Sequence, residues 1–338
     1  MIAWLLMNWA VAFLTLLLLA NLPRPTLVAV EKASGKIGFF TASGKLVSEV
    51  EIGGHPHEMA ISSDGRYLFT TDNGVMLMTE KTDGGNSSSI VDLVERKKVG
   101  VIDLGPHRRP HGIDFDPSTG HVLVTTELPS KLLILDPARK AVVDTYDIGG
   151  KAPHMVRLAP DHRTAWISCT DTGTVTALDL QTRAFEQILV GARPQGIEFS
   201  PDFRRLYVAN SDGYSVTVID TTTKKVVGEI PLGSAHSGPV RVIPSRDGKV
   251  VIAALQPDHA IAFADASTLK QTKILPLPGP PVSMTLSADG KLAYCSVQDL
   301  DTVFVVSLAR RTILRSFKTP PHSGPDPVLP IPAPANAH

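Results

Sequence analysis

Three histidines and one glutamine each follow a proline at the start of an apolar run, and they recur with nearly constant spacing. His57, His111, His154 and Gln195 are 54, 43 and 41 residues apart. If the chain repeats with this period, the four side chains occupy equivalent positions along one arc of the fold. Three neutral imidazoles with an amide oxygen or a water form a ligand set for zinc, manganese or iron, so metal binding is one hypothesis. The alternative is that these side chains contact an organic ligand or bond to neighbouring backbone groups.

Charged residues are predicted near the same arc. Arg109 and Arg193 each immediately precede one of the prolines, and a guanidinium group there suits the carboxylate of an acidic sugar or organic acid. Asp72, Glu127 and Asp171 fall in turns that we expect on the same face. A carboxylate in such a place can orient an imidazole or act as a general base, although carboxylates at an opening are more often solvated. The five residues join the predicted ligand-binding set, and no catalytic residue is assigned.

The composition disfavours several classes of activity. Lys plus Arg and Asp plus Glu number 33 each, so the formal net charge is zero and provides no broad positive field for a nucleic-acid backbone. No Gly-x-Ser-x-Gly turn occurs in the chain, which disfavours a nucleophilic serine hydrolase. The two cysteines are too few for a disulfide framework.

The spacing of the prolines predicts a repeat fold. Six units begin with a leading proline: Pro56, Pro110, Pro153, Pro194, Pro239 and Pro281. Each unit contains four short β-type runs separated by Gly, Pro, Asp or Asn turns, the pattern of a four-stranded antiparallel meander. Before these units, runs at residues 26–31, 36–41 and 45–52 match the last three strands of a seventh unit, and a run near Val328 supplies its first strand. We predict an all-β, seven-bladed β-propeller of four-stranded antiparallel blades, closed by a composite blade.

The clearest copy of the repeat carries a family motif. Residues 206–210 have the sequence Leu-Tyr-Val-Ala-Asn, and residues 218–220 have the sequence Val-Ile-Asp. These runs resemble the repeat of the YVTN-type β-propellers and the related lactonase-like propellers, over roughly residues 26–330. The resemblance implies an extracytoplasmic seven-bladed propeller, in a family that binds or processes diverse ligands. The arc of three histidines and one glutamine also resembles the manganese site of the propeller oligogalacturonate lyases.

The N-terminal segment predicts export. Residues 2–22 are predominantly apolar and carry no charge, so residues 1–22 form either a cleaved signal peptide or an uncleaved membrane anchor, and both alternatives stay open. Residues 26–330 form the propeller, and residues 331–338 form a Pro- and Ala-rich tail. We expect a monomeric periplasmic or extracellular protein that contacts a membrane only through an uncleaved N-terminal segment.

These features together predict a binding site at one end of the propeller. The connections between blades and the turns between the second and third strands of each blade share one face, so their residues surround the channel mouth. We expect a small-molecule or oligosaccharide ligand there. The alternatives are a metal-assisted lactonase or lyase acting on an acidic sugar derivative, and a platform for a protein partner. A loop at residues 74–86 is about ten residues longer than its counterparts and lies on the same face, as functional loops on rigid scaffolds often do.

Overall fold

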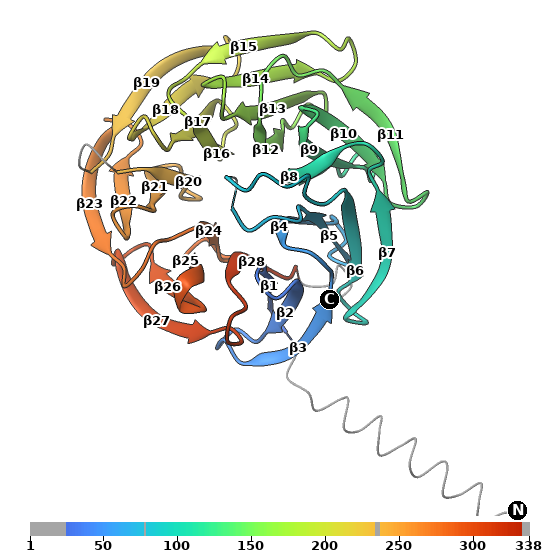
Figure 1. Cartoon of the computed structure of the whole chain (residues 1–338). Coiled ribbons are helices and arrows are strands. Elements are labelled where there is room, and N and C mark those ends of the chain that lie inside the picture. Colours follow the sequence, from blue (N-terminus) through green and yellow to red (C-terminus); the bar gives the residue numbers. More distant parts are fainter. Residues whose placement is uncertain (1–24, 78, 234–236, 333–338) are drawn as a thin grey trace, which may run out of the picture.

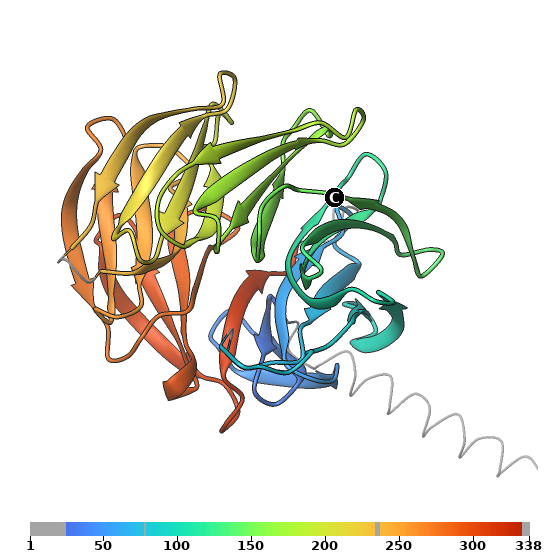
Figure 2. The same ribbon diagram turned by 45° about the horizontal axis from the view of Figure 1, so that its top comes forward.

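The protein is described by a computed structural model that covers residues 25–77, 79–233 and 237–332. Its 28 strands form seven four-stranded antiparallel sheets arranged as blades around a central axis (Figure 1). An oblique view shows the blades facing one another around that axis (Figure 2). Within the described ranges, the one helical segment is a single 3-10 turn, η1 (Gln298–Leu300). The predicted fold class, an all-β seven-bladed propeller, is confirmed.

Blades 1 to 3 each run in chain order from the innermost to the outermost strand. Blade 1 contains β4 (Pro56–Ile61), β5 (Tyr67–Asp72), β6 (Ser87–Asp92) and β7 (Lys97–Asp103). Blade 2 contains β8 (Arg108–Phe115), β9 (Val122–Leu128), β10 (Lys131–Asp136) and β11 (Ala141–Tyr146). Blade 3 contains β12 (Pro153–Leu158), β13 (Thr164–Cys169), β14 (Thr174–Asp179) and β15 (Phe185–Leu189).

Blades 4 to 6 repeat this order. Blade 4 contains β16 (Pro194–Phe199), β17 (Arg205–Asn210), β18 (Ser215–Asp220) and β19 (Lys225–Pro231). Blade 5 contains β20 (Pro239–Pro244), β21 (Val250–Leu255), β22 (Ala260–Asp265) and β23 (Lys270–Pro276). Blade 6 contains β24 (Ser283–Leu286), β25 (Leu292–Val297), β26 (Thr302–Ser307) and β27 (Thr312–Lys318).

Blade 7 is composite and joins the two ends of the described chain. It contains β28 (Pro325–Pro330), β1 (Leu27–Glu31), β2 (Lys36–Phe40) and β3 (Leu46–Glu51). In the pairing of β1 with β28, Val28 lies opposite Leu329 and Ala29 lies opposite Val328. The composite blade is therefore confirmed, and β28 covers the edge that β1 would otherwise expose.

An aspartate at the end of the third strand stabilises the turn that leads to the fourth strand in several blades. Asp92 Oδ1 accepts hydrogen bonds from the backbone amides of Val94 and Glu95, both at 2.9 Å. The same arrangement recurs at Asp136, Asp179, Asp220 and Asp265. A short carboxylate side chain can satisfy two amides that the turn leaves unpaired. These acidic residues stabilise the hairpins rather than form a site.

The hydrophobic core lies between neighbouring blades. One cluster combines Val216 and Val218 of β18 with Val251 and Ala253 of β21, so blades 4 and 5 pack face to face. The second and third strands of most blades are buried on both faces, which is why they are nearly continuous apolar runs. This packing makes each blade a rigid support for the inner strand that faces the axis.

Two predicted segments lie wholly or partly outside the described residues. The N-terminal segment at residues 1–22 lies entirely outside them, and the tail at residues 331–338 overlaps them only at residues 331–332. In the part of the chain that the structure describes, no helix has the length and apolarity needed to cross a membrane. Export therefore stays a prediction.

Candidate ligand-binding site at the channel mouth

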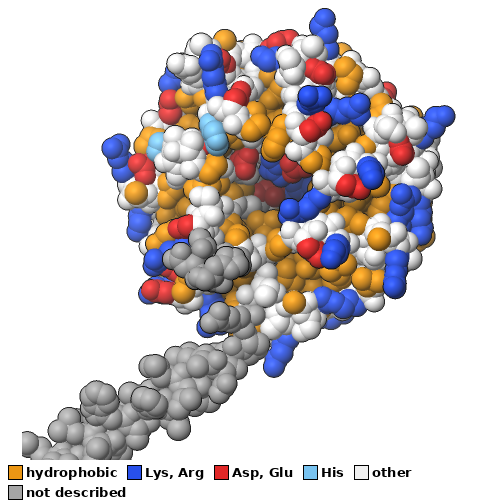
Figure 3. Space-filling view, turned by 180° about the vertical axis from the view of Figure 1, so that it is seen from behind, with side chains coloured by type: hydrophobic (Ala, Val, Ile, Leu, Met, Phe, Trp, Pro, Cys, Tyr) orange, Lys and Arg blue, Asp and Glu red, His pale blue; other side chains and the backbone are white. Residues whose placement is uncertain are grey.

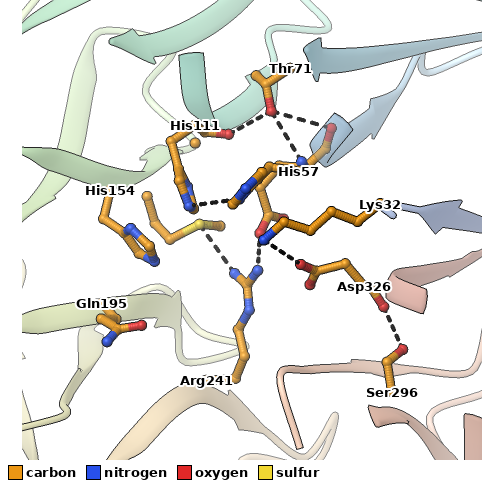
Figure 4. Close-up of polar contacts among 12 residues, drawn as sticks. Lys32, His57, Thr71, His111, His154, Gln195, Arg241, Ser296 and Asp326 are labelled. Atoms are coloured by element: carbon orange, nitrogen blue, oxygen red, sulfur yellow. Dashed lines mark hydrogen bonds and ion pairs between the residues drawn. The ribbon is translucent and has the colours of Figure 1, made fainter. Parts of the chain in front are cut away.

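One position of the repeat surrounds a single cavity. In all seven blades, the residue after the leading proline lines a cavity of about 240 Å³, which we call the mouth cavity. These residues are His57, His111, His154, Gln195, Val240, Val282 and Asp326. The four predicted members point toward the same space from consecutive inner strands, β4, β8, β12 and β16 (Figure 4). The structure thus brings the predicted arc together and extends it to a complete ring.

Hydroxyl groups on the second strands fix the backbone of this ring. Thr71 Oγ1 on β5 donates to the carbonyl oxygen of His111 at 2.8 Å and accepts from the amide of Glu58 at 3.0 Å (Figure 4). The equivalent donor and acceptor pairs are Thr125 with His154, Ser168 with Gln195, and Ser296 with Asp326. Each bond joins the second strand of one blade to the inner strand of the next, so the ring is held across blade boundaries.

The hydrogen bonds of His57 and His111 determine their tautomers. The carbonyl of Val75 lies 3.0 Å from His57 Nε2, and because a carbonyl can only accept, this nitrogen carries the proton. His57 Nδ1 must then accept from His111 Nε2, which lies 3.1 Å away. This order leaves His111 Nδ1 unprotonated, and it is buried with no hydrogen-bond partner among the described residues. His154 Nδ1 is likewise buried, with no hydrogen-bond partner among the described residues.

Burial keeps the three imidazoles neutral. Desolvation lowers the pKa of His57 and of His111 well below the ordinary value, and nearby Lys32 and His154 add to the effect. Desolvation, assisted by the cationic side chains of Arg193 and Lys32, lowers the pKa of His154 to about 3. At neutral pH the three rings therefore act as uncharged hydrogen-bonding groups.

Neutral imidazole is also the form that binds metal ions, but the three rings do not converge on one point. His57 Nδ1 and His111 Nε2 face each other, whereas His154 stacks on His111 with ring centroids 3.8 Å apart and an angle of 33° between the planes. Across residues 25–77, 79–233 and 237–332, no group of three or more His, Cys, Asp or Glu side chains is arranged to hold a metal ion. Metal binding by His57, His111, His154 and Gln195 stays a prediction.

Two ion pairs, which sequence reasoning missed, form the other side of the mouth cavity. Lys32 Nζ lies 3.9 Å from Asp326 Oδ2, which also accepts a 3.0 Å hydrogen bond from Gln298 Nε2. Arg241 on β20 pairs with Glu58 on β4, and its other terminal nitrogen lies beside the sulfur of Met155 (Figure 4). Since β4 and β20 belong to blades 1 and 5, this pair crosses the channel.

Burial acts on these charged groups as well. Desolvation raises the pKa of Asp326, and the Lys32 and Arg241 cations oppose that rise. Desolvation likewise lowers the pKa of Lys32, with the Asp326 carboxylate opposing the change. In each case the neighbouring opposite charge favours the charged form, whereas burial disfavours it.

The long loop at residues 74–86 covers part of the mouth cavity. Its residues Met76, Leu77 and Thr79 line the cavity. Arg109 holds the loop by donating to the carbonyl oxygens of Glu80 and Thr82, the latter at 2.9 Å from Nη2. In this structure the guanidinium group of Arg109 supports the loop, and its predicted anion-binding role stays a prediction.

Glu127, Asp171 and Arg193 line a neighbouring cavity of about 580 Å³ together with Arg109. Arg109 Nη1 lies 3.3 Å from Glu127 Oε2, and both side chains are largely buried. Desolvation raises the pKa of Glu127, and its bond to Arg109 opposes the rise. Arg193 lines both this cavity and the mouth cavity, so it is the one predicted arginine that reaches the ring.

Asp72 lies inside blade 1, away from the mouth cavity. Its carboxylate accepts hydrogen bonds from the hydroxyls of Thr70, Ser87 and Ser89 at 2.7, 2.8 and 2.7 Å. The side chain is 5% exposed, and burial raises its pKa. Asp72 on β5 therefore links this strand to β6 through Ser87 and Ser89.

No protein-family model matches the chain, and no curated protein matches it. Solved structures do match in fold. Hydrazine synthase of Kuenenia stuttgartiensis has a TM-score of 0.71 at 20% identity, over 86% of this chain and 97% of that chain. A functionally unknown protein from Desulfotomaculum acetoxidans has a TM-score of 0.75 at 16% identity, over 90% and 98%. The dihydro-heme d1 dehydrogenase NirN, in complex with DHE, has a TM-score of 0.65 at 19% identity, over 88% and 64%.

These similarities agree with the propeller architecture derived from the strands. At such identities they show the fold alone. The YVTN resemblance of residues 206–210 stays a prediction, and the chain is a seven-bladed β-propeller with structural neighbours among propeller proteins.

Proposed function

We propose that this chain is an exported β-propeller that binds a small hydroxylated anion, of the acidic-sugar class, in the mouth cavity. The observation that carries the proposal is the ring of seven equivalent residues around one cavity, most of them polar and held by bonds between blades. A repeat needs no polar side chain at that position for stability, because Val240 and Val282 occupy it in blades 5 and 6.

The charges around the mouth cavity favour a single negative charge on the ligand. Lys32 and Arg241 are matched by Asp326 and Glu58. Arg193 is additional, since it is 41% exposed and its nearest carboxylate, on Asp212, is 4.0 Å away. An exposed ion pair at that separation contributes little, so the guanidinium group is available to a ligand carboxylate.

The uncharged polar groups favour hydroxyls on the remainder of the ligand. Neutral His154 and the amides of Gln195, Gln256 and Gln298 line the cavity, and such groups both donate to and accept from hydroxyls. The volume of about 240 Å³ lies below the roughly 300–1,000 Å³ typical of sites for drug-sized ligands. A monosaccharide-sized ligand therefore fits better than an oligosaccharide.

Binding is favoured over catalysis because the imidazoles are poor bases. A general base works best when its pKa is near the operating pH. The pKa of His154 is lowered to about 3, and burial keeps those of His57 and His111 well below the ordinary value. The lactonase or lyase alternative would need a different base.

Isothermal titration with D-galacturonate tests the proposal. We expect saturable binding at one site per chain, with D-galactose, the neutral counterpart, at least about ten-fold weaker because it lacks the carboxylate that Arg193 would bind. The Gln195→Ala variant should weaken galacturonate binding about five-fold or more through a lost hydrogen bond. The matched control Gln181→Ala, at an exposed turn, should bind as the wild type does. Absence of binding, or equal binding of the two sugars, would overturn the proposal.

A further inference from the structure

A second, larger cavity lies at the other end of the channel. It has a volume of about 810 Å³, and we call it the apolar cavity. Glu58 and Arg241 line both cavities, so their ion pair separates the two. The residues that line the apolar cavity include Pro330 and Pro332 at the C-terminal end of the described chain. Figure 3 shows this face, with a central hollow surrounded by hydrophobic side chains and with charged side chains deep inside it.

The wall of the apolar cavity is built from later positions of the same inner strands. Six of the seven inner strands contribute a large apolar side chain to it: Ile61, Ile113, Ile197, Ile243, Met284 and Leu329. The seventh, β12, contributes Arg157. An open cavity of this size with a mostly apolar lining and a few polar groups matches the usual character of a small-molecule site.

The polar groups of the apolar cavity carry a surplus of positive charge. Arg157 Nε lies 3.0 Å from Glu198 Oε2, and Arg241 pairs with Glu58, so these charges are balanced. Arg246 also lines the cavity, is exposed, and forms no ion pair with another described residue. Three guanidinium groups thus face two carboxylates.

We propose that the apolar cavity binds a small amphipathic anion, with its apolar body against the apolar side chains of the inner strands and its single acid group at Arg246. An apolar body gains free energy by leaving water for this wall. Arg246 supplies a planar donor pair that matches a carboxylate or sulfonate. The mouth cavity lacks such a wall, so the two ends of the channel select different anions. This inference does not depend on the proposed function of the mouth cavity.

Anilinonaphthalene sulfonate, a fluorescent amphipathic anion, tests the proposal on the folded chain. We expect its fluorescence to rise saturably with one site per chain, and dodecanoate to displace it. Arg246→Glu should weaken probe binding about five-fold or more, because it replaces attraction with repulsion. Phe203→Asp, at a rim residue that is 45% exposed, should weaken it by a similar factor. Both positions are exposed, and near-ultraviolet circular dichroism verifies that each variant is folded.

A matched control separates a local effect from a general change in charge. Arg204→Glu places the same charge change at another exposed turn residue that does not line the cavity, and it should leave probe binding within about two-fold of the wild type. Equal weakening by Arg204→Glu and Arg246→Glu would overturn the proposal. So would absence of a saturable signal from the folded chain, or displacement of the probe by dodecyltrimethylammonium, a cationic amphiphile, as effectively as by dodecanoate.

Discussion

The two ends of the channel are built from the same inner strands yet have opposite surface chemistry. The mouth cavity is lined by the first positions of those strands and is rich in imidazole, amide and charged groups. The apolar cavity is lined by the later positions and is rich in isoleucine and other large apolar side chains. In this propeller, position along the inner strand therefore decides which side chains surround each end of the channel.

The two ends are also stabilised differently. At the mouth, hydroxyls such as Thr71 and Ser168 hold the ring by hydrogen bonds between blades. At the other end, side chains such as Ile197 extend from the packed cores between blades. Between them, the Arg241–Glu58 pair spans the channel. Substitutions along the channel should consequently separate effects on the two ends.

Removing β28 should destroy both ends at once. The strand supplies Asp326 to the mouth cavity and Leu329 to the apolar cavity, and it covers the edge of β1. A chain ending at Lys318 loses the inner strand of blade 7, so we expect failure to fold or a large fall in melting temperature, measured by circular dichroism. A chain ending at residue 332 keeps β28 and serves as the control. Equal stability of the two truncated chains would show that the composite blade does not close the ring.

Removing one member of the pair between the cavities should cost about 3–5 kcal/mol of unfolding free energy, because the other charge stays buried without its partner. Arg241→Met leaves the carboxylate of Glu58 buried without its cationic partner. The side chains of Arg241 and Glu58 are only 12% and 8% exposed. The double variant Glu58→Gln/Arg241→Met should recover much of the loss, as measured by urea unfolding. If the single and double variants were equally destabilised, the pair would not act as a unit.

The mouth should make stability depend on pH. Native His154 has its pKa lowered to about 3, whereas an unfolded histidine titrates near about 6.5. As pH falls below the unfolded value, the unfolded state binds the proton first, so native stability is present above that pH and is lost toward the native pKa. Within this window, each unit by which the pH falls lowers the unfolding free energy by about 1.4 kcal/mol for such a histidine.

Unfolding free energies between pH 7 and pH 5 measure this dependence. His154→Gln should flatten the decline, because it removes one proton that only the unfolded state binds in this range. His259→Asn, at an exposed turn, is the control and should follow the wild type. An unchanged slope in His154→Gln would contradict the neutral, buried imidazole.

His111→Ala should have a smaller and local effect. It removes the donor to His57 Nδ1 and one member of the ring, so galacturonate binding should weaken by about 1–3 kcal/mol. Binding of anilinonaphthalene sulfonate should not change, because His111 does not line the apolar cavity. Parallel loss of both ligands would mean that the two ends are not independent.

The sequence predicted the repeat well because turn residues and leading prolines mark every blade. It also predicted the positions of His57, His111, His154 and Gln195, since equivalent repeat positions face the same space. The same rule finds Asp326, which follows Pro325 as His57 follows Pro56, and so extends the arc to blade 7.

Other parts of the site depend on three-dimensional pairing. Glu58 and Arg241 are 183 residues apart and meet across the channel, so no local pattern marks them. Arg109 immediately precedes Pro110 in the sequence, but its guanidinium group bonds to carbonyls of the long loop, a partner that repeat spacing does not reveal. Repeat logic therefore predicts where a side chain lies better than what it binds.

Titration of D-galacturonate into the chain already saturated with anilinonaphthalene sulfonate tests most directly the claim that the channel has two chemically distinct ends. The account predicts that galacturonate binds with unchanged affinity at one site per chain while the probe fluorescence stays constant. Displacement of the probe in proportion to the galacturonate bound, or no galacturonate binding in the presence or absence of the probe, would contradict it.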